Sequence, residues 1–476
     1  MNLISRLPQR TTRPLGRVGR VIGTAAVIAA VMPLPGAVAA KVAVTPTAAA
    51  PPPVVVPSVW LSPTGNDATC VRRNPGRPCA TFSRAYQIAA SGDVVAVSGG
   101  TYAMTEPNAG ATTILPDPTK TDRVTFACQG NGDVTFAARN FTFFPGTTNV
   151  TVRGSCFRFH VVRIGYGGYP ARTQGIVLDG VHMDSFECAG CSDLTISKSE
   201  IGPLTACYAP GTAGNGPNGY PVPQSAWCDP NDPVQAYWAT QPNGTVNEQS
   251  EPYIHNGAAG LPTNIKLISN HVHGLQTKDP ANIHTGGLLI WNVDGLLLRG
   301  NVFDHNAVYD IESNDGDVEN NVVIERNTFG WPVYPLDPRQ PVPGGETKKD
   351  WRELTLGHRT ANYANWVIRY NTFAHGMTAE GTWTNAKVVG NVLGSYSTCG
   401  AGLAYDHNVG VAGGSACGGL QVRVFPYTDY GGIDFRLVTK SRALRYLAGV
   451  LPTELVPKEL RAAKPKPTLK KPKKKK

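Results

Sequence analysis

The chain has 476 residues and a formal charge of +10 at pH 7, and the positive charge is concentrated at its two ends. The first forty residues contribute +5 and the last twenty contribute +9, which leaves residues 41–456 at −4. Because this body is mildly acidic, the sequence argues against an extended basic surface of the kind that binds nucleic acids.

Residues 1–40 have the pattern of a secretory signal peptide. They carry five arginines and no acid, followed by an apolar run at 21–31 and small residues at 37–40. A basic start, an apolar middle and a small-residue end are typical of secretion signals. The alternative is a membrane anchor, but the apolar run has only 11 residues, and a bilayer-spanning helix needs ~20. We therefore expect an extracellular protein without a transmembrane segment.

Two segments flank the predicted folded body, which extends over residues 58–450. Residues 41–57 are rich in Ala, Pro and Val, a composition typical of extended linkers. Residues 451–476 are rich in Lys and Pro and are expected to be disordered. This Lys-rich tail could bind anionic cell-wall polymers or serve solubility alone, and both alternatives stay open.

Ten cysteines form an even set, which predicts disulfides in an exported chain. Closeness in sequence favours four pairs, which are Cys70–Cys79, Cys128–Cys156, Cys207–Cys228 and Cys399–Cys417. Cys188 and Cys191 remain, with C-x-x-C spacing, and the sequence leaves their pairing undecided. A redox or zinc role is the alternative for them, but no second C-x-x-C or His pair accompanies this motif.

The body begins with a predicted strand at 59–61, and apolar residues at helical spacing predict a helix over 82–89. This helix is expected to cover the open end of the first coil, where unpaired strand edges would invite aggregation. Residues 94–97 are the first predicted strand of the repeating region.

A short phrase then recurs between residues 149 and 393. It consists of an apolar strand, an Asn or Gly, and a second apolar strand, as in 264–272, 321–329 and 365–373. Each strand is too short to bury its own face, so coils must stack into one continuous core, which predicts an all-β solenoid. The Asn before each second strand is expected to adopt a left-handed backbone and to hydrogen-bond its counterpart on the next coil. These residues are Asn270, Asn301, Asn327, Asn371 and Asn391.

The segment "SPTGNDATC…PCATFSRAYQIAASGDVVAVSGGTY" resembles the start of secreted bacterial proteins of the right-handed parallel β-helix (pectin-lyase-like) superfamily. The N-x-x-I-x-x-N-x-F coils and the stretch "DFRLVTKSRALRYLAG" are similar to the coils and the closing segment of such proteins. The resemblance covers residues 59–449 and implies a right-handed parallel β-helix with an N-terminal capping helix. It does not imply one activity, because the superfamily includes lyases, hydrolases, epimerases and inactive binders.

The resemblance also implies a polysaccharide site on the face that contains the strand after each Asn turn and its loop. Alignment of the coils puts these polar side chains in that row: Glu187, Trp291, Asn292, Asp310, Glu312, Glu353, His358 and Arg359. Residues two apart share one side of a strand, so Asp310 and Glu312 are expected to point outward together while Ile311 points inward.

Two mechanisms fit this row. A lyase acting on a uronic-acid polymer would use Ca²⁺ or a cationic side chain together with a base. The carboxylates that could bind Ca²⁺, the expected cofactor, are Asp310, Glu312, Asp315 and Asp317. The candidate bases are His284, His358 and Arg359. A glycoside hydrolase would instead use Asp310 and Glu312 as carboxylates with separated pKa values. The alternative to both is that these acids are ordinary solvated residues.

Similar proteins often carry His-x-Asp-Gly-Ile-Gln at the coil that here begins at His284. The histidine matches, but Gly286 stands at the Asp position and Leu289 at the Gln position. This departure favours a binding protein over an enzyme. His271 and His273 follow an Asn turn, where alternation is expected to turn one of them inward, so a structural role is favoured over a metal site.

Two stretches that interrupt the repeat are candidate walls of a binding site. Residues 205–256 are rich in aromatic side chains, of which Trp227 and Trp238 are candidates for stacking on sugar rings. The alternative is that these rings pack the core of their own loop. Residues 331–351 form the second candidate wall, next to Arg352, which could contact anionic sugars.

Together these features predict a secreted, monomeric carbohydrate-active β-helix protein that cleaves or binds an acidic polysaccharide, with lyase chemistry as the favoured enzymatic activity. The alternative is a non-catalytic polysaccharide-binding or structural protein of the cell wall or cell surface.

Overall fold

A computed structural model gives the fold of the folded body. The predicted signal peptide, residues 41–55 of the linker and the Lys-rich tail lie outside the described residues. The structure describes 56–102, 112–137, 140–212, 214, 221, 224–231, 251–278, 285–307, 309–313, 318–330, 352–356, 362–374, 376–394, 397–411, 415–422, 427–429, 434–437 and 442–447.

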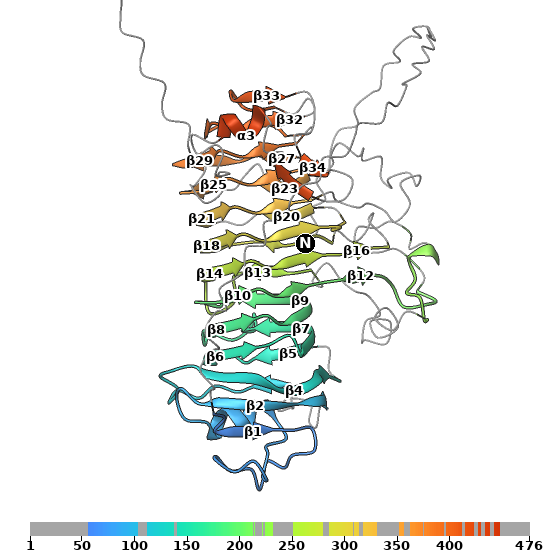
Figure 1. Ribbon diagram of the computed structural model, residues 1–476, viewed down its shortest axis with the longest axis vertical. Coiled ribbons are helices and arrows are strands. Elements are labelled where there is room, and N and C mark those ends of the chain that lie inside the picture. The colour runs from blue at the N-terminus through green and yellow to red at the C-terminus, as the bar shows by residue number, and fades with distance from the viewer. Residues whose placement is uncertain are drawn as a thin grey trace, which may run out of the picture. The chain divides into compact units, whose positions relative to one another are not determined.

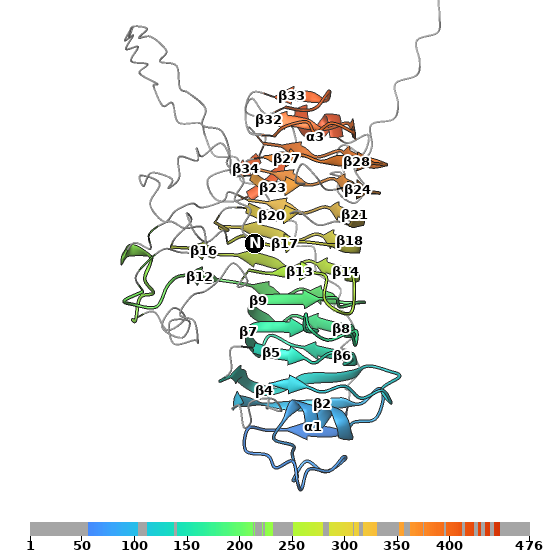
Figure 2. The same cartoon turned by 180° about the vertical axis from the view of Figure 1, so that it is seen from behind.

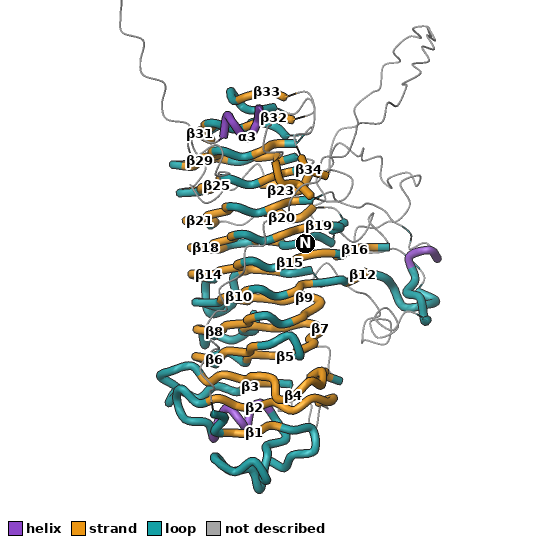
Figure 3. The backbone as a smooth tube through the Cα atoms, in the orientation of Figure 1, coloured by secondary structure: helices purple, strands orange, loops and turns teal. Residues whose placement is uncertain are grey.

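The body winds as the right-handed parallel β-helix that the sequence predicted (Figure 1). One sheet includes 31 of the strands that the structure describes. Short strands of successive coils pair in parallel, so they stack into three faces, which we name A, B and C (Figures 2 and 3). Four long strands bend at a corner and contribute to two faces each. They are β2 (Val94–Tyr102), β4 (Val124–Phe136), β7 (Phe157–Ile164) and β9 (His182–Ala189).

Face A contains the first halves of β2 and β4 and, in later coils, the first strand of the predicted repeat. Its other strands are β1 (Val59–Leu61), β6 (Thr148–Arg153), β8 (Gln174–Asp179), β10 (Thr195–Ser197), β14 (Thr263–Ile268), β18 (Val293–Arg299), β21 (Glu319–Glu325), β24 (Asn362–Ala364), β25 (Val367–Arg369), β28 (Thr382–Thr384), β29 (Ala386–Val389) and β31 (Leu403–Asp406).

Face B follows the Asn turn and begins with the second halves of β2 and β4 and the first halves of β7 and β9. Its further strands are β11 (Glu200–Ile201), β15 (His271–His273), β19 (Val302–Asp304), β22 (Thr328–Phe329), β26 (Thr372–Phe373), β30 (Val392–Leu393), β32 (Val409–Val411) and β33 (Leu420–Val422).

Face C completes each coil and includes the second halves of β7 and β9. Its further strands are β3 (Thr113–Ile114), β5 (Asn140–Phe143), β13 (Tyr253–His255), β17 (Leu289–Ile290), β20 (Tyr309–Ser313), β23 (Arg352–Leu356) and β27 (Met377–Ala379).

Two strand pairs and one short 3₁₀ helix of the described residues lie outside the main sheet. β12 (Leu204–Ala206) and β16 (Leu275–Thr277) pair in parallel and project to one side of the stack in Figures 1 and 2. η1 (Gln224–Ala226) follows in the aromatic insertion, and β34 (Tyr427–Asp429) pairs with β35 (Asp434–Leu437) in antiparallel fashion. No helix among the described residues is long and apolar enough to cross a membrane.

The core is made of inward side chains that repeat at the same position of successive coils. On face B, Phe303, Phe329 and Phe373 are fully buried and stack in one column, with ring centroids 5.1 and 4.7 Å apart. Each further coil adds its own inward side chains to the core, so the core lengthens along the stack and has no single centre. Each coil therefore adds stability through the apolar area that it buries, at about 25 cal/mol per Å².

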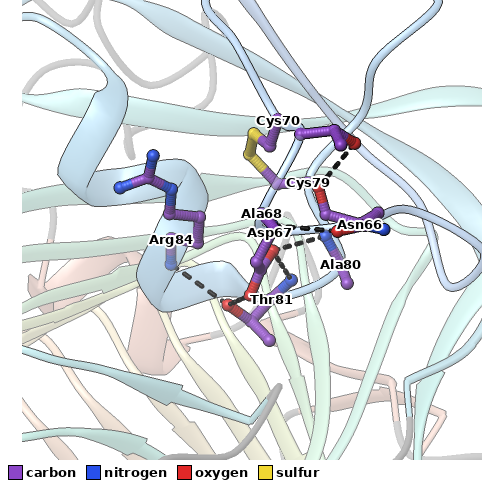
Figure 4. The surroundings of a disulfide bond; sticks show 9 residues. Asn66, Asp67, Ala68, Cys70, Cys79, Ala80, Thr81 and Arg84 are labelled. Atoms are coloured by element: carbon purple, nitrogen blue, oxygen red, sulfur yellow. Dashed lines mark hydrogen bonds between the residues drawn. A yellow bond between two sulfur atoms is a disulfide. The ribbon is translucent and has the colours of Figure 1, made fainter.

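Helix α1 (Phe82–Ile88) closes the N-terminal end, as predicted. Asp67 prepares this helix, because its carboxylate accepts from the Ala80 and Thr81 amides and from the Thr81 hydroxyl (Figure 4). The Thr81 hydroxyl in turn accepts from the Arg84 amide at the helix N-terminus. Phe82 is fully buried and packs edge-on against the ring of Tyr102, which places the helix over the first coil.

The second helix, α3 (Arg442–Leu447), lies in the stretch that resembles a closing segment. Its Ala443 and Leu447 pack on Val392 and Val409, which occupy outward positions of face B. This helix therefore covers an apolar stripe that the last coils would otherwise expose.

A ladder of buried amides lies at the turn from face A to face B and confirms the predicted stacking. From Asn301 onward, each Asn side-chain oxygen accepts from the backbone amide and side-chain amide of the Asn one coil before it, at 2.9–3.1 Å. The buried ladder consists of the five predicted residues, Asn270, Asn301, Asn327, Asn371 and Asn391, and continues to Asn408. The predicted left-handed backbone of these Asn is wrong, since it belongs to the residue before each of them, such as Ser269 (φ 56°) and Arg326 (φ 58°).

All ten cysteines form disulfides. The four predicted pairs are confirmed. Cys188 and Cys191, whose pairing the sequence left open, form the fifth disulfide, with 5.5 Å between their Cα atoms. Both cysteines are fully buried, so this pair is a structural link and not a zinc site.

Candidate functional site

Asp310 and Glu312 lie on β20 and share one side of this strand, with Ile311 turned into the core, as alternation predicted. The expected exposure of Asp310 is wrong, however, because its side chain is fully buried. Asn306, from the preceding turn, donates to its carboxyl oxygen Oδ1 at 2.7 Å. Burial raises the pKa of Asp310 well above its ordinary value. Asp310 is therefore not one of the exposed carboxylates from which the predicted Ca²⁺ site was assembled.

The remaining members of the predicted catalytic and Ca²⁺ set are outside the described residues or described only in part. His284, Asp315, Asp317, His358 and Arg359 lie outside the described residues. Arg352 and Glu353 lie on β23, whose backbone alone is described at these positions. Glu312 is half-buried. Their proposed roles stay predictions, and the described residues do not assemble the expected Ca²⁺ site around Asp310.

A buried network beside Asp310 explains the departure at Gly286. Glu251 accepts from the Tyr309 hydroxyl at 2.7 Å and from the Gly286 amide at 2.8 Å. A Cβ atom on Gly286 would lie 2.0 Å from the ring of Tyr309. No larger residue, an aspartate included, fits at position 286 without displacing this tyrosine. The backbone at Gly286, where the His-x-Asp-Gly-Ile-Gln motif has its aspartate, packs directly against the ring of Tyr309.

Two predicted sugar-binding residues have structural positions. The Asn292 side chain is buried, and its Oδ1 accepts from the Val318 amide at 2.9 Å, which fixes the start of the next coil. Trp227 is half-buried, packs against the core and donates through Nε1 to the carbonyl oxygen of Thr212 at 3.2 Å. For Trp227 the structure therefore supports a packing role, which was the alternative to stacking on a sugar ring. Trp238 lies outside the described residues.

Face C nonetheless has a surface patch with the chemistry of a sugar site. We name the face C patch by its five residues, Arg163, Glu187, Tyr253, His255 and Trp291. Arg163, Glu187 and Tyr253 occupy the same position of three successive coils. His255 and Trp291 lie two positions further along their strands.

Ring contacts and ion pairs hold the face C patch together. Tyr253 and His255 stack at 4.3 Å, and Trp291 meets Tyr253 edge-on at 5.8 Å. Glu187, one of the predicted binding residues, contacts Nε of Arg163 at 3.0 Å and Nε2 of His255 at 3.2 Å. Trp291, the other predicted binding residue here, leaves 42% of its surface exposed. These contacts fix polar and aromatic groups side by side on a solvent-facing strand row.

Two further exposed aromatic residues, Tyr166 and Tyr169, were missed by the sequence reasoning. They follow β7, and their rings contact each other at 5.8 Å. Their loop joins the loop after β13 through a hydrogen bond from the Ala258 amide to the Gly167 carbonyl at 2.8 Å. The pattern G-Y-G-G-Y was a visible signal for exposed rings in the sequence. The glycines interrupt the alternation of a strand, so the two tyrosines are not expected at core positions.

Face B carries a second cluster of polar side chains, of which the sequence had singled out only His271 and His273. We name it the histidine cluster, formed by His182, Glu200, His271, His273 and Asp304. The expectation that His271 or His273 turns inward is wrong, because Val272 between them is the buried residue and both histidines face outward. Their rings stack at 4.2 Å.

Histidine–carboxylate contacts connect four successive coils in this cluster. Glu200 contacts Nδ1 of His182 through one carboxylate oxygen, Oε2, and Nε2 of His273 through the other, Oε1, the latter at 2.9 Å. Asp304 contacts Nε2 of His271 at 2.9 Å and Nδ1 of His305 at 2.7 Å. Burial alone would raise the pKa of Asp304, but its hydrogen bonds with His271 and His305 outweigh burial and lower the pKa below its ordinary value.

No protein-family model and no curated protein matches this sequence. Solved structures with similar coils include "Rhamnogalacturonan lyase", at 12% identity and a TM-score of 0.28, covering 76% of this chain and 75% of that chain. Pectate lyase Pel9A matches at 12% identity and a TM-score of 0.34, covering 82% of this chain and 91% of that chain. PfbA, a surface adhesin of Streptococcus pneumoniae, matches at 10% identity and a TM-score of 0.35, covering 67% of this chain and 77% of that chain. These similarities concern the fold alone.

Proposed function

We propose that this chain is an extracellular β-helix protein that binds polysaccharide through the face C patch. The observation that carries the proposal is the row of Tyr253, His255 and Trp291, whose rings are held in fixed geometry on an outward strand row. Five disulfides support an oxidising, extracellular location. The predicted signal peptide agrees with this location.

The geometry of the rings suits a sugar chain. Aromatic faces pack against the C–H faces of pyranose rings, and a tryptophan exposed at 42% has one such face available. Parallel strands on neighbouring coils lie ~4.8 Å apart, so a polymer that follows the stack meets side chains from several coils. Tyr166 and Tyr169 extend the aromatic surface beyond the end of β7.

An acidic polysaccharide is the substrate class that we favour. Arg163 supplies a positive charge to the face C patch and His255 an imidazole, and Glu187 between them contacts both. A uronic-acid carboxylate could exchange for Glu187 at these groups, which makes binding dependent on salt. The Lys-rich tail, outside the described residues, would add attraction of the same sign.

Binding is favoured over cleavage because Asp310, the central residue of the predicted catalytic row, is buried and hydrogen-bonded to Asn306. Cleavage by β-elimination is the enzymatic form of the proposal. It would need a base and a carboxylate-neutralising group, for which His284, His358, Arg359 and Ca²⁺ stay the predicted candidates.

Affinity electrophoresis of the full chain in gels that contain uronic-acid polymers tests binding. We expect retardation that Trp291→Ala and Tyr253→Ala each weaken at least tenfold. The control is Val302→Ala, an exposed apolar residue on face B, which should leave retardation unchanged. Equal retardation of wild type and both face C variants would contradict the proposal, as would migration of the wild type that no polymer alters.

Absorbance near 235 nm, measured on the same polymers with Ca²⁺ and with chelator, tests cleavage separately. β-Elimination leaves an unsaturated sugar that absorbs at this wavelength. A flat trace with polymer binding retained would exclude β-elimination on these polymers, and the absence of new reducing ends would then exclude hydrolysis as well. A rise in absorbance would establish a lyase, and its response to chelator would show whether a metal is required.

A further inference from the structure

We propose that the histidine cluster on face B is a binding site for a divalent transition metal ion, with Zn²⁺ as its principal ligand. His271, His273 and Asp304 would supply two imidazole nitrogens and one carboxylate oxygen. The inference uses no residue of the face C patch and stands independently of the proposed function.

The three side chains already converge. One potential ligand atom from each of His271, His273 and Asp304 lies within 4.8 Å of the others. Ligands of a tetrahedral zinc ion, at bond lengths of about 2.1 Å, lie about 3.4 Å apart. Small rotations of the side chains would close this difference, because His271 is exposed and His273 is half-buried, so neither ring is locked in the core.

The fold supplies this convergence through its register. His271 and His273 are two apart on β15, so both point to the same side of face B. β15 pairs with β19 so that His273 lies directly beside Asp304. On the other side, His271 lies beside Glu200 of β11. A carboxylate therefore stands on the neighbouring coil at each edge of the histidine pair.

The donor types select the class of ion. Imidazole nitrogens with one carboxylate suit Zn²⁺, Cu²⁺ and Ni²⁺, whereas Ca²⁺ and Mg²⁺ prefer sites made of oxygen. Three protein ligands leave a fourth position of a tetrahedral ion open to solvent, as in zinc sites that bind a further molecule.

The surroundings of the three ligands also fit a metal site. Metal-binding histidines commonly have a second partner that orients the ring. Glu200 contacts His273 at 2.9 Å and also contacts His182, so it can orient one ligand ring. A cavity of about 220 Å³ next to the cluster is lined by His182, Asp184 and Glu200, among others. This cavity meets the histidine cluster at His182 and Glu200, and solvent reaches the proposed ligands directly at the exposed His271.

Metal titration of the full chain, without a polyhistidine tag and stripped by chelator, tests the proposal. Calorimetry with Zn²⁺ should show one ion bound per chain, and Co²⁺ should give visible absorption bands of a nitrogen- and oxygen-coordinated ion. His271→Gln and His273→Gln should each weaken Zn²⁺ binding at least tenfold, and the double variant at least a hundredfold.

His407→Gln is the matched control, because His407 is an exposed histidine paired with Asp406 at 2.6 Å and belongs to no group of potential metal ligands among the described residues. This variant should bind Zn²⁺ within about twofold of wild type. Thermal unfolding in chelator shows whether the variants fold, and if the double variant does not, the exposed His271→Gln decides alone. Absence of Zn²⁺ and Co²⁺ binding by wild type, or equal binding by wild type and the folded cluster variants, would overturn the proposal.

Discussion

Two rows of stacked asparagines cross the same coils and differ in almost every physical respect. The buried ladder lies between faces A and B, and its Asn327 is 2% exposed. The surface ladder lies at the start of face A, where Asn365 donates to Asn321 and Asn385 donates to Asn365. Both rows come from the same repeat, in which one Asn begins the phrase and another lies in the turn between its two strands.

Backbone conformation separates the two rows further. Asn321 and Asn365 of the surface ladder have left-handed backbones, at φ 56° and 58°. Members of the buried ladder do not, and the tight turn is made by the residue before them. One row therefore uses asparagine for the backbone shape that it tolerates, and the other uses it for hydrogen bonds that water cannot replace.

Asn327→Gly should produce the largest loss of stability. Its side chain donates to the Leu298 carbonyl and to Asn371, and accepts from Asn301. Removal leaves several buried polar groups without partners, at about 1–3 kcal/mol each. We expect a loss of about 4 kcal/mol in the free energy of unfolding, measured by guanidinium denaturation. A loss below about 1 kcal/mol would show that water reaches the buried ladder.

Glu319→Gln should have the next largest effect and should depend on pH. Burial raises the pKa of Glu319 to about 8, against a hydrogen bond from Ser313 at 2.6 Å that lowers it. The unfolded carboxyl group ionises near its ordinary pKa, so the stability that the protonated group contributes is complete at low pH. It is lost as pH rises toward 8. Between pH 5 and 8 the stability of the glutamine variant should change by about 3.5 kcal/mol less than that of the wild type, because each pH unit between the two pKa values corresponds to about 1.4 kcal/mol.

Glu325→Gln, on the same strand, is the control with opposite sign. Burial would raise the pKa of Glu325, but hydrogen bonds from Arg369 and Arg299 lower it below its ordinary value. Its contribution is therefore present at neutral pH and is lost as pH falls below about 4.5. If Glu319→Gln and Glu325→Gln changed the pH dependence of the free energy of unfolding in the same direction, burial of Glu319 and ion pairing of Glu325 would not explain how their pKa values differ.

The sequence predicted the buried ladder because its physical cause is local and repeated. An apolar strand on each side of the asparagine forces the amide inside, and a buried amide needs a partner on the next coil. Alternation also identified which residues share a side of β20. It could not show that Asn306 covers Asp310, because that contact depends on how the turn between faces B and C folds.

The histidine cluster shows where sequence reasoning lacked information. Its members come from β9, β11, β15 and β19, and residue 182 is more than a hundred positions before residue 304. Their meeting depends on coil register, which loops of unequal length conceal. The spacing His-x-His on one strand was the local signal, and reading it requires knowing that the intervening Val272 is the inward residue.

The smallest effect is expected for the surface ladder and completes the comparison. Asn365→Gly removes an exposed pair of amide hydrogen bonds, while glycine adopts φ 58° more readily than asparagine. These changes nearly cancel, so the free energy of unfolding should change by less than about 0.5 kcal/mol. Asn365→Ala should lose about 1 kcal/mol, because a Cβ without a local hydrogen bond is strained in the left-handed region. If the glycine variant lost as much as Asn327→Gly, hydrogen bonding along the stack, rather than burial, would govern both rows.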